Sequence, residues 1–67
     1  MQPLNADTIT DDQIEALRIE AREHDDALQV AYCNVALGIT PMIALTATRY
    51  GARIQCADAI NNARAAI

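Results

Sequence analysis

Small sites for nucleophilic or metal chemistry are most often built from cysteine and histidine, and this 67-residue sequence has only His24, Cys33 and Cys56. A structural zinc site needs about four ligands, and the sequence contains no CxxC pair. His24 is followed by two aspartates, which is typical of an exposed histidine at a helix end. We therefore expect no catalytic, cofactor-binding or metal-binding residue, and we expect that the protein is not an enzyme.

The two cysteines leave three interpretations open. The favoured one is that both are free thiols that pack as small buried hydrophobic groups in a reducing compartment. A Cys33–Cys56 disulfide joining two helices and a single reactive thiol are the alternatives. The N-terminal residues include no basic segment of a signal peptide, so we expect a cytoplasmic location.

The apolar residues supply only a thin core. Of the 35 hydrophobic residues 14 are alanine, and the sequence has no Phe or Trp. A chain of this length has room for one domain, which excludes a nucleotide-binding α/β unit or a catalytic barrel. Small chains of this kind usually need a crosslink, a metal or a partner subunit, and we expect a homodimer.

The net charge of −4 is unevenly distributed, with −6 in residues 1–26 and +2 in residues 27–67. This balance disfavours binding to nucleic acid through bulk electrostatics, although a local basic patch stays possible. Residues 27–48 carry no charge and are long enough to span a bilayer. Polar residues interrupt this segment, and Gly38 and Pro41 indicate the end of one helix and the start of another. We therefore expect a buried or subunit-interface segment, and we expect no binding to a membrane.

The clearest local signal is a capping box, in which Thr10 is followed three residues later by Gln13. Ile9 and Ile14 stand at the positions of a hydrophobic staple, and two aspartates occupy the first turn. These signals predict a helix over residues 11–23 or 11–24. Residues 1–8 are predicted to be a flexible leader, and residues 9–67 a single helical domain.

A second helix is predicted over residues 26–37, capped by Asp25 or Asp26 and ended by Gly38. Its apolar residues cover nearly the whole circumference, which predicts burial on more than one side. Thr40 and Pro41 then predict a helix that runs to Arg49 or Tyr50.

Residues 52–66 have the pattern of a last helix, and Gly51 is either a turn before it or a residue inside one long helix. The predicted core stripe of this last helix is Cys56, Ile60, Ala63 and Ile67. The chain as a whole is predicted to be all-α, a small bundle of three to four short helices that forms a homodimer.

Apolar residues in excess of what one small core can bury predict a surface for a partner or for a second copy. The residues predicted to form this interface are Ile19, Leu28, Val30, Tyr32, Val35, Leu37 and Met42.

A helix-turn-helix unit that binds DNA is the alternative. Ala47 and Gly51 have the spacing of a small residue and a turn glycine in such a unit. Three arginines, Arg49, Arg53 and Arg64, would then contact phosphate groups. The acidic net charge disfavours this interpretation.

The run ITDDQIEALRIEAR at residues 9–22, Cys33 and the Cys-Ala-Asp-Ala-Ile run at residues 56–60 form a recognisable layout. It resembles small uncharacterised helical proteins of bacterial and Mu-like phage genomes that open with I-T-D-x-Q-I-x-x-L-R-x-E-A. Residues 38–51 are longer and more apolar here than in that pattern. The resemblance implies a mobile-element context, in which short helical proteins often bind and inhibit a host protein.

The sequence therefore predicts a non-enzymatic protein–protein interaction module that needs no cofactor. Its expected partners are a second copy and a host regulatory or defence protein, which a phage-encoded modulator would inhibit by occlusion. The alternative function is that of a small helix-turn-helix transcriptional regulator.

Overall fold

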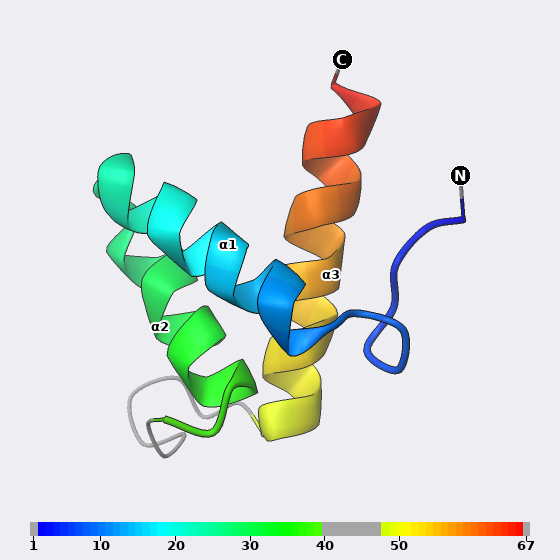
Figure 1. Ribbon diagram of the computed structural model, residues 1–67, viewed down its shortest axis with the longest axis horizontal. Helices are drawn as coiled ribbons and strands as arrows, with labels where there is room; N and C mark the ends of the chain where they lie inside the picture. Colours follow the sequence, from blue (N-terminus) through cyan, green and yellow to red (C-terminus); the bar gives the residue numbers. More distant parts are fainter. Residues whose placement is uncertain (1, 40–47, 67) are drawn as a thin grey trace.

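Within residues 2–39 and 48–66, three helices follow one another: α1 (Asp11–Glu23), α2 (Ala27–Ala36) and α3 (Arg49–Ala65). The computed structural model describes residues 2–39 and 48–66, and this part of the chain contains no strand. Helix α2 packs against both α1 and α3, whereas α1 and α3 make few direct contacts with each other (Figure 1). The predicted all-α bundle is confirmed.

Helix α1 begins where the capping box predicts. The Thr10 hydroxyl accepts a hydrogen bond from the Gln13 backbone N–H at 3.1 Å, and the Gln13 side chain accepts one from the Thr10 N–H at 2.8 Å. The staple residues Ile9 and Ile14 are both buried. Two donors at the helix start are thereby satisfied while the apolar pair fixes the entry of the chain.

Helix α2 has a polar cap at one end and a glycine at the other. The Asp26 carboxylate accepts a hydrogen bond from the Gln29 N–H at 3.2 Å. After the C-terminal cap at Leu37, Gly38 has φ of +75°, the left-handed conformation in which a glycine ends a helix without a steric penalty. The predicted bounds, residues 26–37, therefore differ from the observed ones by one residue at each end.

Helix α3 starts at a cap, Thr48, that the sequence pattern did not predict. The Thr48 backbone is extended, with ψ of 165°, and its hydroxyl accepts a hydrogen bond from the Gly51 N–H at 2.9 Å. The predicted helix over residues 41–50 lies mostly outside the described residues, but its extension through Thr48 to Arg49 or Tyr50 is wrong. Gly51 lies in the first turn of α3 and forms no turn between two helices.

The core is built from small side chains where α2 meets α3. Cys33, Ala36, Ala52 and Cys56 are fully buried there, and they let the two helix backbones approach closely. The predicted stripe on the last helix is only partly correct. Cys56 is buried and Ile60 is half-buried, whereas Ala63 is exposed and Ile67 lies outside the described residues.

The segment before α1 packs against α3, although the sequence predicts a flexible leader at residues 1–8. The Leu4 N–H donates to the Asn61 side chain at 2.9 Å, and the Asn61 amide donates back to the Leu4 carbonyl at 2.8 Å. Ala6 is buried. Residues 4–9 therefore lie along α3 and cover the side of the core that α2 leaves open (Figure 1).

Arg53, near the N-terminal end of α3, holds this segment in place. Its guanidinium donates to the Ala6 carbonyl at 3.1 Å and to the Ile9 carbonyl at 2.5 Å, and it pairs with Asp11 at 3.1 Å. Two backbone carbonyls that have no helical partner are satisfied by one side chain.

Among the described residues, no helix has both the length and the apolar character needed to cross a bilayer.

Candidate functional site

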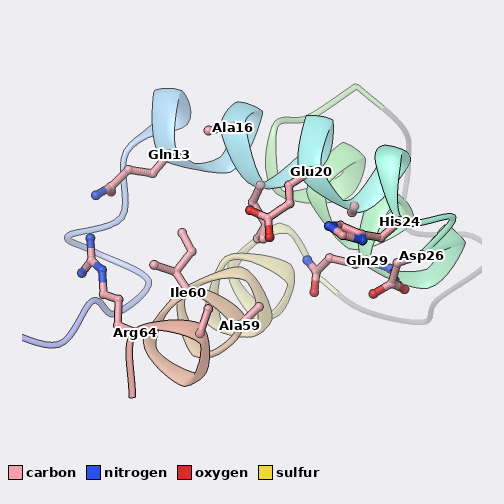
Figure 2. A pocket seen from close by; sticks show the side chains of 12 residues that line it. Gln13, Ala16, Glu20, His24, Asp26, Gln29, Ala59, Ile60 and Arg64 are labelled. Carbon is pink, nitrogen blue, oxygen red and sulfur yellow. Dashed lines mark hydrogen bonds between the residues drawn. The ribbon is translucent and has the colours of Figure 1, made fainter. Parts of the chain in front are cut away.

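A groove of about 490 Å³ opens between α1 and α3, the two helices that diverge from each other (Figure 2). The N-terminal end of α2 closes one of its ends. The residues that line it are Gln13, Ala16, Leu17, Glu20, Ala21, His24, Asp26, Gln29, Ala59, Ile60, Ala63 and Arg64.

The middle of the groove is apolar, and small side chains line its sides. Leu17 and Ile60 are half-buried against the core and form its floor. Ala16, Ala59 and Ala63 line its sides, and their single methyl groups leave room between the two helices. Small residues of this kind allow another helix to approach the backbone closely, as at ordinary helix–helix contacts.

The two ends of the groove differ in charge. His24, Asp26 and Gln29 lie at one end with Glu20 on the side toward the middle, and Gln13 and Arg64 lie toward the other end (Figure 2). Glu20 and Arg64 are both exposed. A ligand that lies along the groove would therefore meet carboxylates at one end and a guanidinium at the other.

Directly beneath the acidic end lies a pair of thiols. The Sγ atoms of Cys33 and Cys56 are 3.8 Å apart, and both cysteines are free and fully buried. The Gln29 side-chain amide lies within donor distance of both sulfurs, at 3.5 Å from Cys33 and 3.8 Å from Cys56. The favoured expectation, two buried free thiols, agrees with this arrangement.

The surroundings of the two thiols separate their acidities. Hydrogen bonds from the Cys56 thiol and then from the Gln29 amide lower the pKa of Cys33 to about 7, against the effect of burial. Sharing its proton with Cys33, together with burial, raises the pKa of Cys56. The first proton to leave the pair is therefore the one on Cys33.

Within residues 2–39 and 48–66, no group of three or more histidine, cysteine or acidic side chains is arranged to hold a metal ion. Cys33 and Cys56 are accompanied by an amide rather than by further ligands. Cys33 and Cys56 are therefore a dithiol with one neighbouring amide.

The residues predicted to form an interface do not lie together in the groove. Ile19 and Leu28 are 52% and 58% exposed, on the outer sides of α1 and α2. Val30, Tyr32 and Leu37 are half-buried, and Val35 is buried in the core, so Val35 offers no surface to a partner. Met42 lies outside the described residues. Because α2 packs on two neighbours, both of its apolar faces are partly covered within one chain.

The three arginines of the predicted nucleic-acid contact also have different surroundings. Arg49 donates to the Ala36 carbonyl at 3.0 Å and so caps the C-terminal end of α2. Arg53 holds the segment before α1. Arg64 is exposed and lines the groove. Two of the three guanidinium groups therefore bind the chain itself.

Comparison of the chain with known protein families, with curated proteins and with solved structures found no match. Sequence reasoning missed the groove because its lining comes from three helices and depends on how far α1 and α3 diverge. The one local signal was the pair Ala59 and Ala63, which stand one helical turn apart on α3.

Proposed function

We propose that this chain is a protein-interaction module that binds one amphipathic helix of a partner protein in the groove between α1 and α3. The observation that carries the proposal is the groove itself, with an apolar floor, alanine sides and opposite charges at its two ends. Binding of an amphipathic helix in such a groove is a recurring mode of peptide recognition.

The shape of the groove favours a helix of another protein over a second copy docked through the same surface. A two-fold interface must be complementary to itself, and two concave surfaces that face each other leave space between them. A single helix presents a convex apolar stripe. The small side chains of Ala16, Ala59 and Ala63 would seat such a stripe close to the two flanking helices.

The charges specify the chemistry of the partner helix. Its residues near Glu20 and Asp26 would be basic, and a residue near Arg64 would be acidic. The excess of acid in residues 1–26 adds to the attraction of a basic segment. The resemblance to proteins of Mu-like phages favours a host protein as the partner. By binding a helix of that host protein, the module would block the contact that the helix makes with the host protein's usual partner.

The test is a titration with a synthetic peptide of about 15 residues, a helix of about 22 Å. The peptide has a Leu/Ala stripe, two lysines at one end and a glutamate at the other, and binding is followed by nitrogen–proton correlation NMR. We expect shift changes that map to the groove. A peptide of the same composition, in which the two lysines and the glutamate exchange ends, should bind more weakly.

A matched pair of variants separates the groove from the rest of the surface. Ala63→Trp fills the groove, whereas Ala65→Trp adds the same ring at another exposed alanine of α3 that does not line the groove. We expect Ala63→Trp to weaken binding at least tenfold, about 1.4 kcal/mol, and Ala65→Trp to leave it unchanged.

Two outcomes would overturn the proposal. Equal effects of the two tryptophan variants would mean that the peptide binds elsewhere. Self-association of the free chain in sedimentation experiments, abolished by Ala63→Trp and retained in Ala65→Trp, would assign the groove to a second copy.

A further inference from the structure

The thiol pair between α2 and α3 has a geometry close to that of a crosslink. A disulfide bond is about 2.05 Å long, so the Sγ atoms of Cys33 and Cys56, now 3.8 Å apart, would need to move by less than 2 Å in total. The two sulfurs come from facing helices and point at one another across the core. Each is the nearest possible reaction partner of the other.

We propose that Cys33 and Cys56 form a site of reversible oxidation, at which a small hydroperoxide converts the dithiol into a disulfide that joins α2 to α3. This goes beyond the proposed binding function and does not rest on it, because the thiol pair belongs to the free chain.

Cys33 is the thiol that reacts first. Its sulfur accepts hydrogen bonds from the Cys56 thiol and from the Gln29 amide, and the positive charge of Arg18 on α1 also favours the thiolate. The carboxylate of Glu15 acts in the opposite direction. Because the thiolate is the nucleophile, the sulfur that loses its proton at the lower pH attacks the peroxide.

The groove provides the route for the oxidant. Gln29 is only half-buried, lines the groove with its side chain and contacts both sulfurs. Movement of this one side chain would open the pair to a molecule of the size of hydrogen peroxide. A larger oxidant would meet the fully buried sulfurs only after the helices separate.

The chemical steps balance without any further reactant. The Cys33 thiolate attacks one peroxide oxygen, the S–O bond forms, the O–O bond breaks, and the leaving hydroxide takes the proton that Cys33 released and becomes water. Cys33 is then a sulfenic acid. The Cys56 sulfur attacks the Cys33 sulfur, the S–S bond forms and the S–O bond breaks. The leaving hydroxide takes the Cys56 proton as a second water.

The test treats the reduced full chain with hydrogen peroxide at a pH above the pKa of Cys33 and follows its intact mass. We expect a monomeric product lighter by two hydrogens. Digestion of this product should release the peptide with Cys33 and the peptide with Cys56 joined by a disulfide, and dithiothreitol should reverse the change fully. A chain whose thiols add oxygen atoms without forming the linkage, or that joins only to a second chain, would overturn the proposal.

Trapping the intermediate tests the order of the two steps. Dimedone present during a brief peroxide treatment of the wild-type chain should label Cys33 rather than Cys56, because the two thiols differ in acidity only while both are present. Cys56→Ala should stop at a sulfenic acid that dimedone labels, because the resolving sulfur is gone. Labelling of Cys56 in the wild-type chain would overturn the assignment of Cys33 as the first nucleophile, and the wild-type mass measurement decides the linkage even if the variant fails to fold.

Discussion

Arg53 connects α3 to the segment before α1 and to the first residue of α1. Its guanidinium binds the carbonyls of Ala6 and Ile9, so its removal leaves two part-buried acceptors without a partner. We expect Arg53→Ala to lower the free energy of unfolding by about 2–3 kcal/mol, measured by urea denaturation.

Two controls show which contact of Arg53 matters. Asp11→Asn removes the ion pair, whose carboxylate is 67% exposed, and one negative charge from the first turn of α1, and it should change stability by less than about 1 kcal/mol. Arg64→Ala, at an exposed position, should change it by less than about 0.5 kcal/mol. An effect of Arg53→Ala no larger than that of Asp11→Asn would contradict the role given to the two carbonyls.

The acidity of Cys33 makes a prediction about pH. With a pKa lowered from 9.0 to about 7, Cys33 should become a thiolate near pH 7, which far-ultraviolet thiolate absorbance measures. A lowered pKa adds stability that is lost as the pH falls, so the free energy of unfolding should rise from pH 7 to pH 9. The raised pKa of Cys56 opposes this trend above pH 9.

The matched variant for the pH prediction is Cys56→Ala, which removes the strongest hydrogen-bond donor to Cys33. We expect its single thiol to titrate at a higher pH than the first thiol of the wild type. Identical titration of the two proteins would mean that Cys56 does not lower the pKa of Cys33.

At the scale of the helices, the Thr48 cap decides where α3 begins. Thr48→Ala removes the acceptor for the Gly51 N–H and should lower the free energy of unfolding by about 1 kcal/mol. Thr48→Ser keeps the hydroxyl and should lose much less. Thermal unfolding followed by circular dichroism measures both, and equal losses would contradict the capping role.

Local signals explain which helices the sequence predicted well. The capping box at Thr10 and Gln13 and the glycine at position 38 act within a few residues, so α1 and α2 were found nearly to the residue. The start of α3 was missed because Thr40 with Pro41 resembles a helix start more closely than Thr48 does. Arg53 gave no signal, because its partners lie more than 40 positions away.

At the scale of the whole molecule, the groove is a surface of charge as well as of shape. Raising the ionic strength from about 0.1 M to about 1 M shortens the Debye length from about 10 Å to about 3 Å. Binding of the lysine-bearing peptide should therefore weaken several-fold, measured by calorimetry. Glu20→Gln should weaken binding at low salt and reduce this salt dependence, whereas an unchanged salt dependence would place the peptide away from the acidic end.

The contacts of the segment before α1 have a consequence for the order of folding. Helical proteins fold fast because most of their contacts are local, yet Leu4 pairs with Asn61 across 57 positions of sequence. During synthesis, α1 and α2 can pair while Arg53 and Asn61 are still to be added. Residues 4–9 must then wait, with their carbonyls in water, until α3 forms. We infer that they join the fold last and leave it first.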